Sequence, residues 1–192
     1  MGVIATSWLA PELFKKEFQD YKDRYLKSDS DADLVMAYIT MQLFIENHFH
    51  YYLRFIIGGG FGSAKSTTGW NEKDYPDKKL ECFEKFLISH KFVFTKNLFK
   101  TITTNYKVIT EIRNLLAHGH RVTTTYAGST KTNSKAKDFL NRQEFAKICL
   151  LANEIADSWN TLLIELQNQE SLLKSSGLPM SHFFDNCKFK VF

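Results

Sequence analysis

An arginine and a histidine stand five positions apart in this 192-residue chain, in the stretch Arg113-Asn114-Leu115-Leu116-Ala117-His118-Gly119-His120. The planar guanidinium of Arg113 presents several donors that match the oxygens of a phosphate group. Histidine is the residue type whose charge changes nearest neutral pH, so a histidine such as His118 is suited to moving a proton. The pair therefore permits phosphodiester chemistry. The plain structural alternative is a polar helix end with Gly119 as its C-cap.

The stretch resembles the signature of the HEPN superfamily, an arginine and a polar residue followed a few positions later by a histidine. Arg113, Asn114 and His118 fill those positions, and Ala117 and Gly119 match the common RNxxAHG form. The resemblance covers eight residues. It implies a small all-helical bundle, a ribonuclease without metal or cofactor, and an active site shared between two protomers.

Apolar residues at helical spacing predict five helices, over residues 7–27, 33–57, 78–99, 101–118 and 141–174. Because Pro and Gly are few, long helices are favoured over many-turned sheets. The β-branched residues around 99–105 leave open whether the third and fourth helices form one bent rod or a helical hairpin. We expect an all-α, antiparallel up-and-down bundle of four to five main helices, HEPN-like, in a single domain over residues 1–192. Loops are expected at 58–77 and 119–137, the latter a polar loop after the motif helix, and a C-terminal tail at 175–192.

Composition and cysteine usage exclude several classes of protein. Cys82, Cys149 and Cys187 are far apart and form no CxxC pair, so neither a disulfide framework nor a zinc site is expected. The first ten residues lack the basic start and apolar run of a signal peptide, and no uncharged apolar run approaches the roughly 20 residues that span a bilayer. The net charge of +4 permits an anionic partner without requiring one. A cytoplasmic location and no membrane partner are expected.

A glycine-rich stretch at residues 59–66 resembles a phosphate-binding P-loop, with residues 51–57 as the preceding strand. Ala64 occupies the position of the second required glycine, and no apolar helical pattern follows Ser66. No second strand ending in a metal-binding aspartate appears. We therefore expect no nucleotide site there.

Two histidine pairs raise a metal-hydrolase alternative. His48 and His50 lie two positions apart, which on a helix points them to nearly opposite sides. His118 and His120 could chelate together, but the sequence offers no evident third ligand. Buried or interfacial histidines with structural roles are the simpler interpretation, and no metal is expected.

In the ribonuclease interpretation, His118 exchanges a proton with the 2′-OH or the 5′-oxygen and Arg113 holds the scissile phosphate. Asn114 orients His118 or the phosphate. On an ideal helix Arg113 and His118 lie roughly 140° apart, whereas Asn114 and His118 share a face. Glu46, the one acid of its helix after Asp33, and His120 are candidate supporting residues.

The segment 119–137 carries basic residues and no acid. It is interpreted either as a solvated loop or as a basic flap that follows a phosphate backbone. Residues 123–126 could form one strand of a hairpin that turns at Gly128. The candidate RNA contacts in this segment are Arg121, Lys131, Lys135 and Lys137.

A single Arg-His pair is an incomplete acid–base site, and a two-fold dimer supplies two of each residue. We therefore expect a homodimeric endoribonuclease that cleaves RNA, as a toxin or abortive-infection type prokaryotic defence effector, with an antitoxin or other regulatory protein as a further partner. The alternative is a non-catalytic HEPN-like module that binds RNA or protein.

Overall fold

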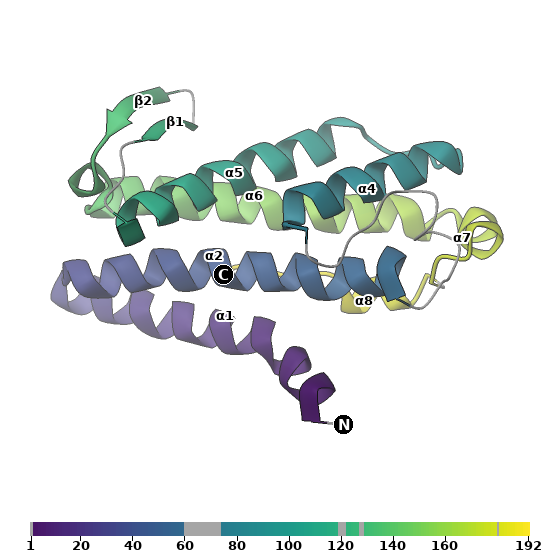
Figure 1. Ribbon diagram of the computed structural model, residues 1–192, viewed down its shortest axis with the longest axis horizontal. Coiled ribbons are helices and arrows are strands. Elements are labelled where there is room, and N and C mark those ends of the chain that lie inside the picture. The colour runs from purple at the N-terminus through teal and green to yellow at the C-terminus, as the bar shows by residue number, and fades with distance from the viewer. Residues whose placement is uncertain (1, 60–73, 119–121, 127–128, 180) are drawn as a thin grey trace. The chain divides into compact units, whose positions relative to one another are not determined.

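The structure is a computed structural model that describes residues 2–59, 74–118, 122–126, 129–179 and 181–192 (Figure 1). Its helices are α1 (Gly2–Ser28), α2 (Asp31–Leu53), the π-helical η1 (Arg54–Gly59), α4 (Pro76–Ser89), α5 (Asn97–His118), the 3-10 helix η2 (Ala136–Phe139), α6 (Arg142–Gln167), α7 (Glu170–Ser176) and α8 (Phe183–Asn186). Two strands, β1 (Val122–Tyr126) and β2 (Ser129–Ser134), follow α5. The helical class is confirmed, and one hairpin is added to it.

The chain packs as two compact units. The first comprises residues 1–47, 104–154 and 191, and the second comprises residues 48–103, 155–190 and 192. The helices α2, α5 and α6 each contribute residues to both units. The single domain over residues 1–192 stays a prediction.

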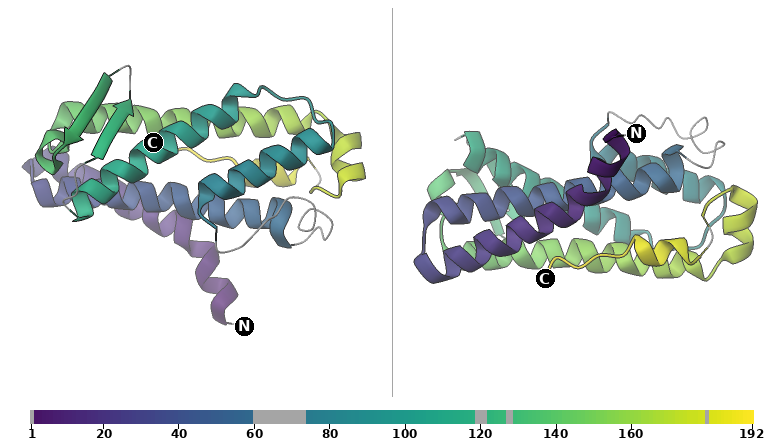
Figure 2. Two further views of the ribbon diagram at one scale, coloured as in Figure 1. Left: turned by 45° about the horizontal axis from the view of Figure 1, so that its top comes forward. Right: turned by 90° about the horizontal axis from the view of Figure 1, so that it is seen from below.

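In the first unit, α1 and α2 are joined by a two-residue connection and lie side by side (Figures 1 and 2). Ser30 caps α2, because its hydroxyl accepts a hydrogen bond from the backbone N–H of Asp33 at 3.4 Å. Asp29 has a left-handed φ of 50°, and its carboxylate accepts from Arg142 Nε at 2.7 Å. The break between the helices predicted over 7–27 and 33–57 is confirmed at residues 29–30, and α2 begins two residues earlier than expected. Pro11 lies inside α1, which begins at Gly2 instead of at the predicted residue 7.

The core of the first unit is formed by the apolar stripes of its helices. Tyr38 is almost fully buried, and its hydroxyl donates to the Phe139 carbonyl at 3.2 Å. Tyr38 and Phe145 pack edge to face with ring centroids 5.2 Å apart. On α5 the buried apolar residues of this unit are Tyr106, Val108, Ile109, Ile112 and Leu115. They fix the helix that carries the motif.

In the second unit, aromatic rings meet around the fully buried Trp159. Phe49 and Phe83 lie 5.2 and 6.1 Å from it between ring centroids. Phe83 of α4 also packs against Phe99 of α5 at 5.9 Å. Since residues 90–96 separate α4 from α5, the region left open by the sequence is a helical hairpin rather than a bent rod.

The helix predicted over 78–99 ends at Ser89, so residues 90–96 were assigned wrongly, whereas 97–99 are helical as the start of α5. Lys91 has a left-handed φ of 62°, which stops the helix. The side chain of Gln169 binds the backbone of the segment that follows α4. Its Oε1 accepts from Val93 N at 2.9 Å, and its Nε2 donates to Val93 O at 2.7 Å. Glu165 accepts from Thr95 N at 2.8 Å. These tertiary bonds replace the helical ones that Val93 and Thr95 give up.

The long C-terminal helix predicted over 141–174 is interrupted once. It ends as α6 at Gln167 and resumes as α7 at Glu170. The helix α7 ends at Ser176, two residues beyond the predicted end, and Gly177 follows with a φ of 72°, in the left-handed region that favours glycine. The N–H of Leu178 then donates to Leu173 O at 3.0 Å, as in a Schellman motif.

The tail after α8 packs within the second unit up to Lys190. The Cys187 carbonyl accepts from Trp159 Nε1 at 2.8 Å and from His48 Nε2 at 2.9 Å. Asn160 makes two backbone bonds to Phe189, at 2.8 and 3.0 Å. The tail is therefore fixed by buried side chains of its own chain.

The predicted polar loop at 119–137 contains an antiparallel hairpin, visible as two arrows in Figure 2. Thr125 pairs with Thr130 and Tyr126 with Ser129, and the register is irregular between Val122 and Thr124. The strand expected at 123–126 is confirmed. The turn expected at Gly128 lies outside the described residues. Most of the loop predicted at 58–77 also lies outside the described residues. Residues 58–59 at its start belong to η1, and residues 76–77 at its end belong to α4.

A candidate active site at the end of α5

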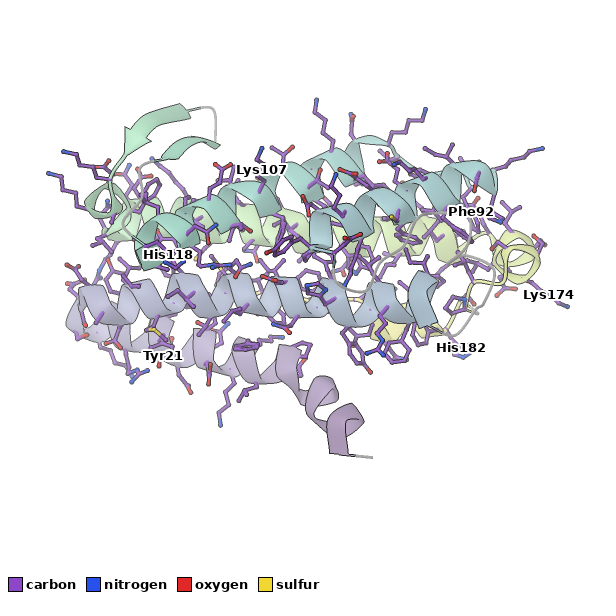
Figure 3. The ribbon with its side chains drawn as sticks, viewed as in Figure 1. Tyr21, Phe92, Lys107, His118, Lys174 and His182 are labelled. Atoms are coloured by element: carbon purple, nitrogen blue, oxygen red, sulfur yellow. The ribbon has the colours of Figure 1, made fainter. Side chains whose placement is uncertain are left out.

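The motif lies in the last turns of α5, which runs without interruption from Asn97 to His118. Figure 3 shows His118 at the end of this helix. Arg113 and Asn114 are half-buried, whereas His118 is exposed. The buried neighbours Ile112 and Leu115 face the core on either side of the arginine and asparagine. The motif is thus held at the rim of the first unit.

Because α5 stays helical up to His118, the geometry of an ideal helix applies to the motif. Arg113 and His118 point about 140° apart, and Asn114 lies one turn before His118 on the same face. The last turn does not unwind to bring the arginine round. Within one chain, the side chains of Arg113 and His118 therefore point in different directions and do not converge on one point.

Arg113 has no acidic partner among the residues that the structure describes. It makes no hydrogen bond or ion pair anywhere in the described ranges, and its Nε is buried without a partner. Nε is the one nitrogen of its guanidinium in this buried, unpaired state. A buried donor left unpaired typically costs about 1–3 kcal/mol. Such a group calls for an explanation, and an external ligand is one.

Asn114 is also unpaired within the described part of the chain, since no side-chain hydrogen bond involves it. Its amide can both donate and accept. It lies between Arg113 and His118 in sequence and around the helix. The two residues predicted to bind and orient a phosphate are therefore both uncommitted.

The structure gives Glu46 a different neighbourhood from the one considered for it. Glu46 accepts a hydrogen bond from Gln42 Nε2, which also lies 3.4 Å from the Tyr106 hydroxyl. Gln42 is fully buried and its Oε1 has no partner. Glu46 makes no bond to Arg113, which lies about two turns beyond Tyr106 along α5. This acid belongs to a buried polar group between α2 and α5.

The basic candidates are spread along the segment after the motif. His120 and Arg121 lie outside the described residues, and Lys131 belongs to β2. Lys135 and Lys137 are exposed and flank the start of η2. The backbone N–H of Lys135 donates to Asp138 at 2.8 Å, so the first acid after the acid-free segment is used as a cap. The structure leaves the role of these lysines a prediction.

His48 and His50, which belong to the second unit, have structural partners. His48 is buried, and its Nε2 donates to the Cys187 carbonyl. Lys79 Nζ, itself on a buried residue, contacts His50 Nδ1. Among the residues the structure describes, no three His, Cys, Asp or Glu side chains gather closely enough to hold a metal ion. The pair His118 and His120 falls partly outside those residues.

The residues before the P-loop-like stretch are helical rather than a strand. Residues 51–53 end α2, and 54–59 form η1. The P-loop requires a strand at that place. The strand considered at residues 51–57 is therefore contradicted, and residues 60–66 of the stretch lie outside the described residues.

Comparison with protein-family models, with curated proteins and with solved structures gives no match. No helix within the described ranges is long and apolar enough to cross a membrane. The likeness to HEPN proteins therefore rests on the motif and on the helix that carries it.

Sequence reasoning overlooked a polar neighbour of Arg113 on α5. Thr110 lies one turn before Arg113, and its Oγ1 is also buried without a partner. Gln42 and Tyr106, which hold Glu46 in place, were also not singled out as polar neighbours. Thr110 lies three positions before Arg113 and four before Asn114. On a helix this spacing makes the side chains neighbours, and it can be read from the sequence.

Proposed function

We propose that this chain is a metal-independent endoribonuclease whose active site combines Arg113, Asn114 and His118 from two protomers. We further propose that it acts in the prokaryotic cytoplasm as a toxin or abortive-infection effector, restrained by an antitoxin or other regulatory protein. The observation that carries the proposal is the unpaired state of Arg113 and Asn114 beside an exposed His118.

A purely structural arginine at a half-buried position is expected to have an acid or several carbonyls as partners. Arg113 has neither within the described residues. A phosphate would satisfy Nε and the terminal nitrogens together, because the guanidinium fork matches two phosphate oxygens. The favoured ligand is therefore the backbone of a nucleic acid.

The proposed reaction uses the hydroxyl of the substrate itself. A base removes the proton from the 2′-OH, the 2′-oxygen forms a bond to phosphorus, and the bond from phosphorus to the 5′-oxygen breaks. An acid returns a proton to the leaving 5′-oxygen. The products are a 2′,3′-cyclic phosphate and a 5′-hydroxyl. His118 carries the proton transfer, Arg113 stabilises the charge on the phosphate, and Asn114 orients the phosphate or the imidazole.

Two protomers are part of the proposal because the reaction needs a base and an acid. One chain supplies a single motif histidine, whereas a two-fold axis near the end of α5 supplies two. We propose an antiparallel, HEPN-like bundle for each protomer, with these helix ends near the axis. The dimer also brings a second Arg113 to the phosphate.

A binding module without cleavage is the second candidate. It is favoured by one observation, the angle of about 140° between Arg113 and His118 within α5. A protein that only holds RNA or a partner protein does not need these side chains to converge.

The experiment that separates the two candidates is incubation of the purified protein with varied RNAs in the presence of EDTA. The nuclease proposal expects cleavage that survives EDTA and yields 2′,3′-cyclic phosphate ends, and RNA with a 2′-deoxy nucleotide at the cut site should resist. Binding without cleavage across all substrates supports the module. Loss of activity in EDTA would support a metal-dependent hydrolase. His118 and His120 would then be the first residues to test as metal ligands.

A further inference from the structure

Thr110 is a half-buried residue of α5 whose hydroxyl oxygen is buried and has no hydrogen-bond partner. Threonines in helices usually bond to a carbonyl three or four positions earlier. Thr103, also half-buried on α5, does so with Phe99 O at 2.8 Å, and Thr40 on α2 does so with Met36 O at 2.7 Å. Thr110 departs from this behaviour.

The position of Thr110 around the helix is specific. Counting about 100° per residue, Arg113 lies about 60° to one side of Thr110, and Asn114 lies about 40° to the other side. His118 lies about 80° from Thr110 in the direction of Asn114. Thr110 and Asn114 therefore occupy the sector that separates Arg113 from His118.

The charges on α5 leave this sector open to an anion. Glu111 is the acid nearest in sequence, and it lies about 160° around the helix from Arg113. Lys107, one turn before Thr110, is exposed, as Figure 3 shows on the outer side of α5. Thr110, Arg113 and Asn114 together form three neighbouring side chains that make no hydrogen bond in the described part of the chain.

We propose that Thr110 is a positioning residue whose hydroxyl donates to the phosphate that Arg113 and Asn114 bind. A change of the Thr110 χ1 angle exchanges the hydroxyl and the methyl group between two staggered positions, both of which threonine adopts in helices. The methyl group then faces the apolar side, and the hydroxyl reaches the phosphate. The inference rests on the proposed function for the identity of the ligand, which is a phosphate of RNA.

The test compares Thr110→Val, Thr110→Ser and the control Thr103→Val. Binding is measured by fluorescence anisotropy with a fully 2′-O-methyl RNA, which cannot be cleaved. In parallel, inorganic phosphate is titrated into ¹⁵N-labelled protein, and the Nε–H signal of Arg113 is followed after assignment by its loss in Arg113→Lys. Thermal unfolding of each variant reports on folding.

We expect Thr110→Val to weaken RNA binding about tenfold, because a hydrogen bond to a charged group is lost. Thr110→Ser should bind within about twofold of the original protein, and Thr103→Val should bind unchanged. Phosphate should shift the Arg113 Nε–H signal, with a lower affinity in Thr110→Val. The Thr110→Val protein should be at least as stable as the original, since an unpaired buried oxygen is removed.

Unchanged RNA and phosphate binding in a folded Thr110→Val protein would overturn the inference, and so would an Arg113 signal that phosphate does not move. These outcomes can be distinguished from a failure of the proposed function, which is tested by cleavage and by its dependence on His118. Cleavage that requires His118 but not Thr110 leaves the nuclease standing and removes Thr110 from its site. Phosphate binding that requires Thr110, in a protein that cleaves no RNA, would support the role of Thr110 and contradict the proposed nuclease activity.

Discussion

Arg113 and His118 are carried by one uninterrupted helix, and they point about 140° apart at its end. Arg113 lies at the edge of the buried face with its Nε unpaired, whereas His118 is exposed. In the proposed reaction, His118 of the same chain would therefore point away from a phosphate bound by Arg113. A second chain can supply a histidine from a better direction.

The first prediction concerns assembly. We expect the protein to be a two-fold homodimer, because one chain supplies one proton-transfer residue and the reaction needs two. Size-exclusion chromatography with light scattering at micromolar concentration measures the mass directly. A strict monomer that still cleaves RNA would contradict the shared site.

A second prediction concerns Glu46. Glu46→Ala removes one of the two acceptors of Gln42 Nε2 and leaves the long 3.4 Å contact with the Tyr106 hydroxyl, on a fully buried side chain whose Oε1 already lacks a partner. The free energy of unfolding should fall by about 1–3 kcal/mol, with little change in the cleavage rate of the folded protein. Chemical denaturation and cleavage kinetics provide the two readouts.

The matched control is Glu111→Ala, since Glu111 is a half-buried acid on α5 without a hydrogen bond or ion pair in the described residues. Its stability should change by less than about 0.5 kcal/mol. A drop in cleavage by Glu46→Ala at unchanged stability would instead make Glu46 a supporting residue of the active site.

Much of the helix pattern could be predicted from local sequence, because its signals are local. The break at 28–31 carries good N-cap residues, and Gly177 supplies the left-handed C-cap. The end of α4 could not be predicted in this way. Residues 90–96 contain neither Gly nor Pro, and their backbone is held by Gln169 and Glu165, far away in sequence.

The same distinction between local and long-range signals applies to the candidate site. Arg113, Asn114 and His118 could be found from their spacing, since the motif is local. Gln42 and Glu46 lie four positions apart on α2, so the spacing behind their hydrogen bond was also present in the sequence. The contact of Gln42 with Tyr106 depends on packing between α2 and α5 and could not be predicted. Nor could the unpaired hydroxyl of Thr110, because threonines at similar positions, such as Thr103, bond to their own helix.

A third prediction concerns backbone strain at Lys91. The φ of 62° is unfavourable for a residue with a Cβ and neutral for glycine. Lys91→Gly should therefore raise the free energy of unfolding by about 1 kcal/mol. Lys85→Gly, an exposed position inside α4, should lower it by about 1 kcal/mol. Equal destabilisation by both substitutions would show that Lys91 is not strained in solution.

A fourth prediction concerns the thiol groups and alkaline pH. Burial raises the pKa of Cys149 to about 12, and it also raises the pKa values of Cys82 and Cys187. At pH 8 the thiolate fraction of Cys149 should be about a thousandfold below that of a free thiol, so alkylation should be slow until denaturant is added. Mass spectrometry after iodoacetamide treatment reports this. Fast native labelling at Cys149 would contradict its burial.

The same shift has a consequence for stability. The folded pKa of Cys149 lies above the ordinary value of 9.0, so its stabilising contribution is complete below pH 9. It is lost as the pH rises from 9 towards 12. Cys149→Ala should therefore show a shallower loss of stability over this range than the original protein.

The most direct test of the central claim is the cleavage rate of His118→Ala relative to the original protein, measured in EDTA on the same RNA. Loss of general acid–base catalysis should lower the rate by about 10²–10⁴-fold. The circular dichroism spectrum and the RNA affinity should stay close to the original values, because His118 is exposed at the helix end. Arg113→Ala should lower both cleavage and RNA affinity, since it removes a charge-assisted phosphate contact. Undiminished cleavage by a folded His118→Ala protein would contradict the account.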